Sequence, residues 1–173
     1  MALRFPPSGF TDRTAARAGV HYASWLRRFA GAIIDGLLLS MINFLIGGVL
    51  SFVPNPFVGA IFPVIELVSL LSVISIVYAT MCLDRLGGQT PGMRVMQIRC
   101  VPVRGHGQVT FAQALTRSIA AALLTSIPWV ISVWVPAIWL LPIVAYLWPL
   151  VDSRRQTWWD HLAATIVLDD RGW

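Results

Sequence analysis

The chain has 173 residues, of which 57% are hydrophobic and 12% are charged, and its mean hydropathy is +0.71. This composition excludes an ordinary soluble domain and predicts an integral membrane protein. All 13 basic residues are arginines, and the formal net charge is +5. In so hydrophobic a chain we interpret the arginines as cationic flanks of membrane spans, and we expect no nucleic-acid partner.

The first segment, residues 1–22, contains prolines, glycines and arginines but no apolar periodicity. We expect a flexible, basic, cytoplasmic tail that lies near anionic lipid headgroups. No small-residue cleavage site accompanies the apolar run that follows, which indicates a retained anchor rather than a signal peptide.

The first predicted span covers residues 29–53 and contains a single ionisable residue, Asp35. At ~1.5 Å per residue this stretch is long enough for a ~30 Å hydrocarbon core. A lone charge at that depth costs about 2.5–3.5 kcal/mol, so Asp35 must be paired, hydrated or protonated. Two interpretations stay open: a structural carboxylate that pairs with a neighbouring helix, and an ion or proton site.

The same span carries small residues at four-residue spacing, namely Ala32, Gly36 and Ser40. Such a face lets a partner helix approach closely. Asn43 follows one turn later and can donate or accept a hydrogen bond across the contact. We therefore predict a helix-packing face along this span.

A second span is predicted over residues 57–83, where Glu66, Ser69 and Ser72 recur at steps of three. If this span runs antiparallel to the first, Glu66 lies level with residues 40–43. Polar groups of both spans then converge between the helices. The candidate ion or proton site consists of Asp35, Glu66, Asn43 and Ser69; the alternative is a protonated Glu66 that is simply hydrogen-bonded to Asn43 or a serine.

The segment after the second span is rich in glycine and proline and lacks the GK[ST] ending of a phosphate loop. Residues 95–103 are β-branched and partly alternating, and residues 108–111 can return after a turn, so we predict a small hairpin on the cytoplasmic side. Thr110 and Gln113 have capping-box spacing and indicate that a further helix begins there.

The long apolar run of residues 112–151 would make a helix of ~60 Å, twice the hydrocarbon thickness. The segments before and after this run both contain arginines, so the positive-inside rule places both segments in the cytoplasm. The chain must then cross the membrane an even number of times. We therefore divide the run into spans 117–134 and 137–151. The alternative is one proline-kinked span and three crossings in all.

The final segment, residues 152–168, is polar and then amphipathic, and we expect it to lie along the membrane interface, followed by a tail at 169–173. The predicted fold class is thus an all-α integral membrane helical bundle of four spans, or alternatively three, with a small cytoplasmic hairpin. Cys82 and Cys100 fall on the cytoplasmic side, where free thiols are expected.

Three motifs together resemble the RDD family of small membrane proteins. They are Arg28 with Asp35, the Gly-Gln-Thr-Pro-Gly sequence at 88–92, and the Arg-Arg-Gln-Thr-Trp-Trp-Asp-His sequence at 154–161. The resemblance covers the predicted domain, residues 23–168, and maps the family's name-giving trio to Arg28, Asp35 and Asp160. Met93 stands where the family often has a lysine. The resemblance implies a helical domain of the cell membrane, for which transport of small solutes or cations is often suspected.

With a cytoplasmic C-terminus, Asp160 can reach Arg28 at the mouth of the first helix, and we predict an ion pair between them. Two functions follow. One is a transport-associated component with a proton or cation site at the intramembrane carboxylates; the other is a non-catalytic scaffold in a larger membrane complex. We expect no enzyme activity, cofactor or metal, and as partners the lipid bilayer together with a second copy or another membrane subunit.

Overall fold

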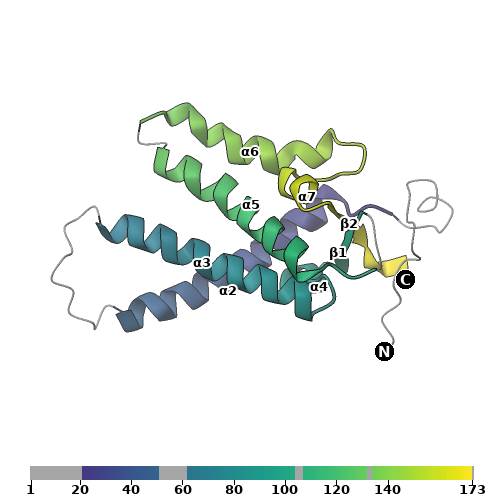
Figure 1. Cartoon of the computed structure of the whole chain (residues 1–173), viewed down its shortest axis with the longest axis horizontal. Helices are drawn as coiled ribbons and strands as arrows, with labels where there is room; N and C mark the ends of the chain where they lie inside the picture. The colour runs from purple at the N-terminus through teal and green to yellow at the C-terminus, as the bar shows by residue number, and fades with distance from the viewer. Residues whose placement is uncertain (1–20, 51–61, 104–106, 132–133, 173) are drawn as a thin grey trace.

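The computed structural model describes residues 21–50, 62–103, 107–131 and 134–172. Long helices diverge from one end of the molecule, and the short helices and a small sheet gather at that end (Figure 1). The long elements are α2 (Trp25–Leu50), α3 (Phe62–Arg85), α5 (Phe111–Ile131) and the segment formed by η1 (Pro136–Trp139), α6 (Leu140–Leu147) and η2 (Trp148–Leu150). The short ones are α4 (Pro91–Val95), β1 (Ile98–Pro102), α7 (Trp158–Leu162), β2 (Thr165–Asp169) and η3 (Asp170–Gly172).

Helix α2 is apolar yet hardly covered by the rest of the chain. Over the described ranges it provides the one stretch long and apolar enough to cross a bilayer, Trp25–Ile46, and only 6% of its most apolar window is buried. Leu37 and Phe44 are 67% and 81% exposed. A helix in the core of a soluble protein would bury these side chains, so lipid is the environment that suits α2. Its range agrees with the first predicted span.

The apolar run of residues 112–151 is divided as the sequence predicted. Helix α5 ends at Ile131, helical structure resumes at Pro136, and α6 packs beside α5 (Figure 1). A break between two helices does not fix the number of crossings, so four and three spans both stay predictions.

Two short polar motifs begin helices. The Thr90 side chain caps α4 by accepting a hydrogen bond from the Met93 amide at 3.2 Å, with Pro91 in the first turn. The predicted capping box is present at α5, where the Thr110 amide donates to Gln113 Oε1 at 3.1 Å and the Gln113 amide donates to Thr110 Oγ1 at 3.3 Å. Both motifs satisfy amides that a helix start leaves unpaired.

The predicted hairpin between residues 95–103 and 108–111 is wrong, because β1 pairs with a strand from the far end of the chain. It is antiparallel to β2, in a register that runs from Ile98 opposite Asp169 to Pro102 opposite Thr165. Residues 165–168 are all buried, whereas Gln108 and Thr110 are exposed. The buried segment is therefore the better partner for the buried strand β1.

This pairing also corrects the placement of the C-terminal segment. It is not a separate amphipathic segment: it forms α7 and β2 and is built into the domain, and Trp159 is only 7% exposed. The expected tail is likewise attached: Asp169 pairs with Arg27 at 3.3 Å, and Asp170 pairs with Arg99 at 3.0 Å.

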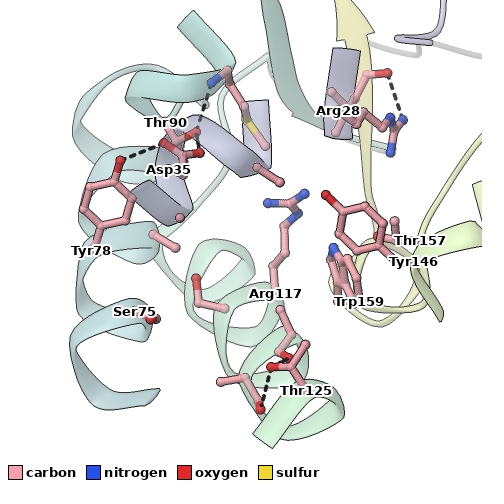
Figure 2. A pocket seen from close by; sticks show the side chains of 18 of the residues that line it. Arg28, Asp35, Ser75, Tyr78, Thr90, Arg117, Thr125, Tyr146, Thr157 and Trp159 are labelled. Carbon is pink, nitrogen blue, oxygen red and sulfur yellow. Dashed lines mark hydrogen bonds between the residues drawn. The ribbon is translucent and has the colours of Figure 1, made fainter. Parts of the chain in front are cut away.

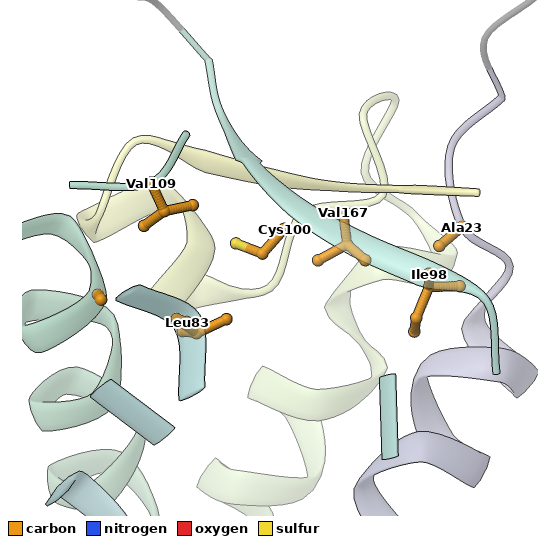
Figure 3. Packing of buried hydrophobic residues seen from close by; sticks show 7 residues of the cluster. Ala23, Leu83, Ile98, Cys100, Val109 and Val167 are labelled. Atoms are coloured by element: carbon orange, nitrogen blue, oxygen red, sulfur yellow. The ribbon is translucent and has the colours of Figure 1, made fainter. Parts of the chain in front are cut away.

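The main hydrophobic cluster joins the two strands to the helix ends (Figure 3). Burial raises the pKa of the Cys100 thiol, which makes this cysteine neutral and unreactive. Close approach also explains Gly88, which has φ +84° and where a Cβ atom would lie 2.1 Å from the Cys100 carbonyl oxygen. The cluster consists of Ala23, Leu83, Ile98, Cys100, Val109, Ala114 and Val167.

Candidate functional site

A cavity of about 370 Å³ lies where the long helices meet the sheet end of the molecule (Figure 2). Helices α2, α3 and α5 form its sides, and α4, α6, α7 and β2 each contribute to its walls. Most of its lining is apolar. The polar and aromatic residues on its walls are Trp25, Arg28, Asp35, Ser75, Tyr78, Thr90, Arg117, Ser118, Thr125, Tyr146, Thr157 and Trp159.

One wall of the cavity holds Asp35, whose carboxylate accepts three hydrogen bonds. Tyr78 Oη donates to Oδ1 at 2.8 Å, the Thr90 hydroxyl donates to Oδ2, and the Gly92 amide donates to Oδ1 at 2.8 Å. The donors come from α3 and from the start of α4. Asp35 therefore connects α2 to α3 and α4, and the three hydrogen bonds offset the cost of placing a carboxylate in an apolar helix.

Glycine makes the junction between α2 and α4 possible. A Cβ atom at Gly92 would lie 2.1 Å from the Gly31 carbonyl oxygen and 2.9 Å from Asp35 Oδ1. Only a residue without a side chain lets the amide approach the carboxylate so closely. This contact gives the Gly-Gln-Thr-Pro-Gly motif a physical role: its threonine and last glycine hold Asp35.

A fully buried carboxylate, Asp160, lies between two arginines that line the cavity. Arg28 Nη1 lies 2.9 Å from Oδ2 and Arg117 Nε lies 2.7 Å from Oδ1. The Thr157 amide also donates to Oδ2 at 3.1 Å, which completes a capping box at the start of α7. The predicted Arg28–Asp160 ion pair is thus present, with Arg117 as a further partner.

The charges of this group do not balance. Burial alone would raise the pKa of Asp160, but attraction to Arg117 and then Arg28, with their hydrogen bonds, lowers it below the usual aspartate range. The carboxylate is therefore ionised at neutral pH. Two guanidinium groups face one carboxylate, which leaves one positive charge in excess.

Both arginines keep unused donor groups. Arg28 Nη2 donates to the Val167 carbonyl oxygen at 3.2 Å, whereas its buried Nε has no acceptor in the described part of the chain. Arg117 donates through Nε alone, and its terminal NH₂ groups find no acceptor among the described residues. Figure 2 shows the guanidinium of Arg117 in the middle of the cavity, between Asp35 and Tyr146.

The small-residue face of α2 borders the cavity. Ala32 and Gly36 line it, and a Cβ atom at Gly36 would meet nothing within 4 Å. Ser40 is exposed. Over this part of α2, then, the predicted packing face is not filled by another helix of the described chain.

The predicted four-residue ion site is only partly described. Asn43 is half-buried, and its Oδ1 atom is buried without a hydrogen-bond partner in the described ranges. The side chains of Glu66 and Ser69 lie outside the described residues. The polar contacts that the structure gives to Asp35 come instead from Tyr78, Thr90 and Gly92. Met93, at the position where the family often has lysine, lines the cavity with its apolar side chain.

Sequence reasoning missed Tyr78, Thr90 and Arg117 as members of the site. For Tyr78 a signal exists, because the three-residue stripe of Glu66, Ser69 and Ser72 continues through Ser75 to Tyr78, and these last two line the cavity. In the described part of the chain, no three histidine, cysteine or acidic residues lie close enough together to hold a metal ion.

Comparison with known proteins gives one match. A model of the RDD family matches residues 22–164, most of the chain, and this range includes Arg28, Asp35 and Asp160. No match was found among curated proteins or among solved structures. Together with the exposed apolar helix α2, the match makes this a membrane-associated protein of mostly helical fold. The chain belongs to the RDD family.

Proposed function

We propose that this RDD-family protein is a transport-associated, polytopic protein of the cell membrane that takes up a proton at Asp35. One observation carries the proposal: the single acid of the apolar helix α2 lies on the wall of a 370 Å³ cavity. A carboxylate next to a cavity in a membrane helix is a functional candidate, because its burial is costly.

The chemistry around Asp35 suits a proton better than a metal cation. Its described partners are donors, whereas Na⁺-like or divalent hard cations require several oxygen ligands. The hydroxyl groups of Tyr78 and Thr90 can also accept a hydrogen bond. They can therefore rotate to receive the new O–H of a protonated Asp35.

Proton uptake would alter the junction with α4. The Gly92 amide can only donate, so it loses strength as a partner when the carboxylate becomes neutral. Helix α4 is then held less tightly against α2. We propose that this loosening changes access to the cavity.

For the topology we propose four spans, formed by α2, α3, α5 and the α6 segment, with the N-terminus in the cytoplasm. The paired arrangement of α5 and α6 and the positive-inside distribution of arginines support it. A single cysteine at the exposed position Ser153 tests it in intact cells. Cys82 is replaced, and the buried Cys100 stays. Four spans predict labelling by an impermeant thiol reagent only after the cells are opened; labelling from outside contradicts them.

Proton flux into proteoliposomes with a trapped pH dye tests the function. The wild type is expected to carry protons under an imposed potential, and Asp35→Asn is expected to lose that flux while it still folds and inserts. Asp84→Asn is the matched control, since Asp84 pairs with Arg85 at 3.4 Å away from the cavity. Equal flux through wild type and Asp35→Asn would contradict the proposal.

A scaffold subunit is the second candidate, favoured by the unfilled face at Ala32, Gly36 and Ser40. A partner helix could approach closely there. This function predicts that Asp35→Asn changes stability or co-purifying partners, with no proton flux in the wild type. The same liposome measurement therefore separates the two functions.

A further inference from the structure

While Asp35 carries a proton, the two arginines that line the cavity leave one positive charge uncompensated. The side chains of Arg28, Arg117 and Asp160 are 8%, 12% and 0% exposed, and they bring two positive charges and one negative charge together. Out of contact with water, a surplus charge is costly unless a counter-ion balances it. A negative group in the cavity would supply that balance.

Arg117 offers the geometry to hold such a group. Its Nε is occupied by Asp160, whereas its terminal NH₂ groups have no acceptor in the described chain and point into the open space (Figure 2). A guanidinium group is planar and binds carboxylate or phosphate oxygens through parallel hydrogen bonds. The free side of Arg117 is therefore suited to an anionic head.

The remainder of the cavity suits an apolar body. Tyr146 and Trp159 stand beside Arg117, with ring centroids 5.8 Å apart, and alanines of α5 line the floor. At ~30 Å³ for each water-sized group, 370 Å³ accommodates roughly a dozen such groups. This size lies at the low end of small-molecule sites, which span about 300–1,000 Å³.

We propose that the cavity binds a small organic anion, with its carboxylate-like head on Arg117 and its apolar body among the aromatic residues. This inference deepens the proposed function by naming the class of solute. It rests on the proposed function for the location of the solute pathway. Nothing in it requires that binding lead to transport.

Charge balance also couples the anion to the proton at Asp35. The titratable groups around Asp35 are Arg28 on its own helix, Tyr78 and Cys82 from α3, Arg117 from α5 and Tyr146 from α6. An ionised Asp35 offsets the surplus positive charge, and a protonated Asp35 does not. The anion is therefore expected to bind more tightly when Asp35 carries its proton.

Calorimetry on the full chain in phosphatidylcholine nanodiscs tests the inference with benzoate and the equally shaped cation benzylamine as probes. Benzoate is expected to bind, and benzylamine to bind at least about tenfold more weakly. Arg117→Gln should weaken benzoate binding by about tenfold or more, the effect of losing a charge-assisted hydrogen bond.

Because Arg117→Gln also breaks an ion pair, a second variant is needed that leaves all charges in place. Gly36→Leu fills the cavity from α2 without a backbone clash and should abolish benzoate binding. Leu37→Phe, on the exposed side of the same helix, adds bulk outside the cavity and should leave binding unchanged. Unchanged binding in a folded Gly36→Leu protein, or equal binding of benzylamine, overturns the inference.

The source of the anion is distinguished by repeating the titration with phosphatidylglycerol in the nanodiscs. If phosphatidylglycerol competes with benzoate, an anionic headgroup can occupy the site. If it does not compete, the occupant is a free solute. Both results agree with an anion site. Binding without proton flux would refute the transport role alone. Proton flux without benzoate binding would refute the anion site alone.

Discussion

Arg28 Nη1 lies 2.9 Å from Asp160 Oδ2 although 132 positions separate the two residues. The contact ties the mouth of the first long helix to the last short one, and Arg117 Nε adds α5 at 2.7 Å. Since Asp160 is fully buried, its carboxylate balances the charge of the two arginines where the three elements pack together. Two of the residues that the resemblance maps to the family's name thus hold these elements together.

Replacement of the shared carboxylate should cost more stability than loss of either arginine. Asp160→Asn leaves two buried guanidinium groups without a counter-ion, for which the free energy of unfolding is expected to fall by about 3–5 kcal/mol. In Arg28→Gln or Arg117→Gln the other arginine still pairs with Asp160. Thermal unfolding in detergent should therefore rank Asp160→Asn as the least stable of the three.

An equal loss of stability in Asp160→Asn, Arg28→Gln and Arg117→Gln would contradict the view that both arginines share the Asp160 carboxylate. Arg85→Gln serves as the control for a lost arginine, because Arg85 is 78% exposed and its pair with Asp84 lies on the surface. Its effect on the unfolding temperature should be close to zero.

Acid should weaken the same cluster in a defined direction. The pKa of Asp160 is lower in the folded protein than in the unfolded chain, because Arg117 and Arg28 outweigh the opposing effect of burial. Its contribution to stability is fully present above the ordinary aspartate pKa of about 3.9 and is lost as pH falls through the lowered folded value. The unfolding temperature of the wild type should drop in this acid window more steeply than that of Asp160→Asn. Parallel curves would show that Asp160 does not titrate in this way.

The sequence was sufficient for the Arg28–Asp160 pair but not for its third member. The family resemblance pointed to both residues, and Asp160 lies in a segment expected on the same side of the membrane as Arg28. Arg117 stood at the start of another apolar run, where an arginine serves equally well as a contact to lipid headgroups. Only the packing of α5 against α7 distinguishes these roles.

Gly92→Ala should disrupt the junction between α2 and α4. The added methyl group would lie 2.1 Å from the Gly31 carbonyl oxygen, so one of the two helices must move. We expect a loss of about 1–3 kcal/mol, as for other overpacked contacts, seen as a lower unfolding temperature.

Gly36→Ala is the matched control for that variant, since its methyl group meets nothing within 4 Å. Greater helix propensity should leave the protein unchanged or stabilise it by up to about 1 kcal/mol. A Gly92→Ala protein as stable as Gly36→Ala would show that α4 does not approach α2 as closely as described.

Substitutions that keep the side-chain shape but remove the hydroxyl group test how much the hydrogen bonds to Asp35 contribute to stability. Thr90→Val removes both the donor to Asp35 and the acceptor that caps α4, and Tyr78→Phe removes one donor only. Each lost hydrogen bond to a carboxylate should cost about 1–3 kcal/mol, with the larger loss in Thr90→Val. Thr90→Ser keeps the hydroxyl and should restore most of the stability. A Thr90→Ser protein as unstable as Thr90→Val would assign the effect to packing.

The sheet shows where local sequence signals fail. The β-branched residues 95–103 predict an extended segment, and the turn that follows them favours a hairpin with residues 108–111. The partner is β2, whose buried apolar residues read equally well as an amphipathic segment on a membrane. Pairing between distant strands depends on the whole bundle that brings them together, and short stretches carry no signal for it.

Infrared difference spectroscopy most directly tests proton uptake at Asp35. Acidification of the wild type in lipid should produce the C=O stretching bands of its protonating carboxyl groups, Asp160 among them. One of these bands should be absent from Asp35→Asn and present in Asp84→Asn. Loss of that band in Asp35→Asn alone would establish that Asp35 accepts the proton. The same bands in wild type and Asp35→Asn would contradict a proton site at Asp35.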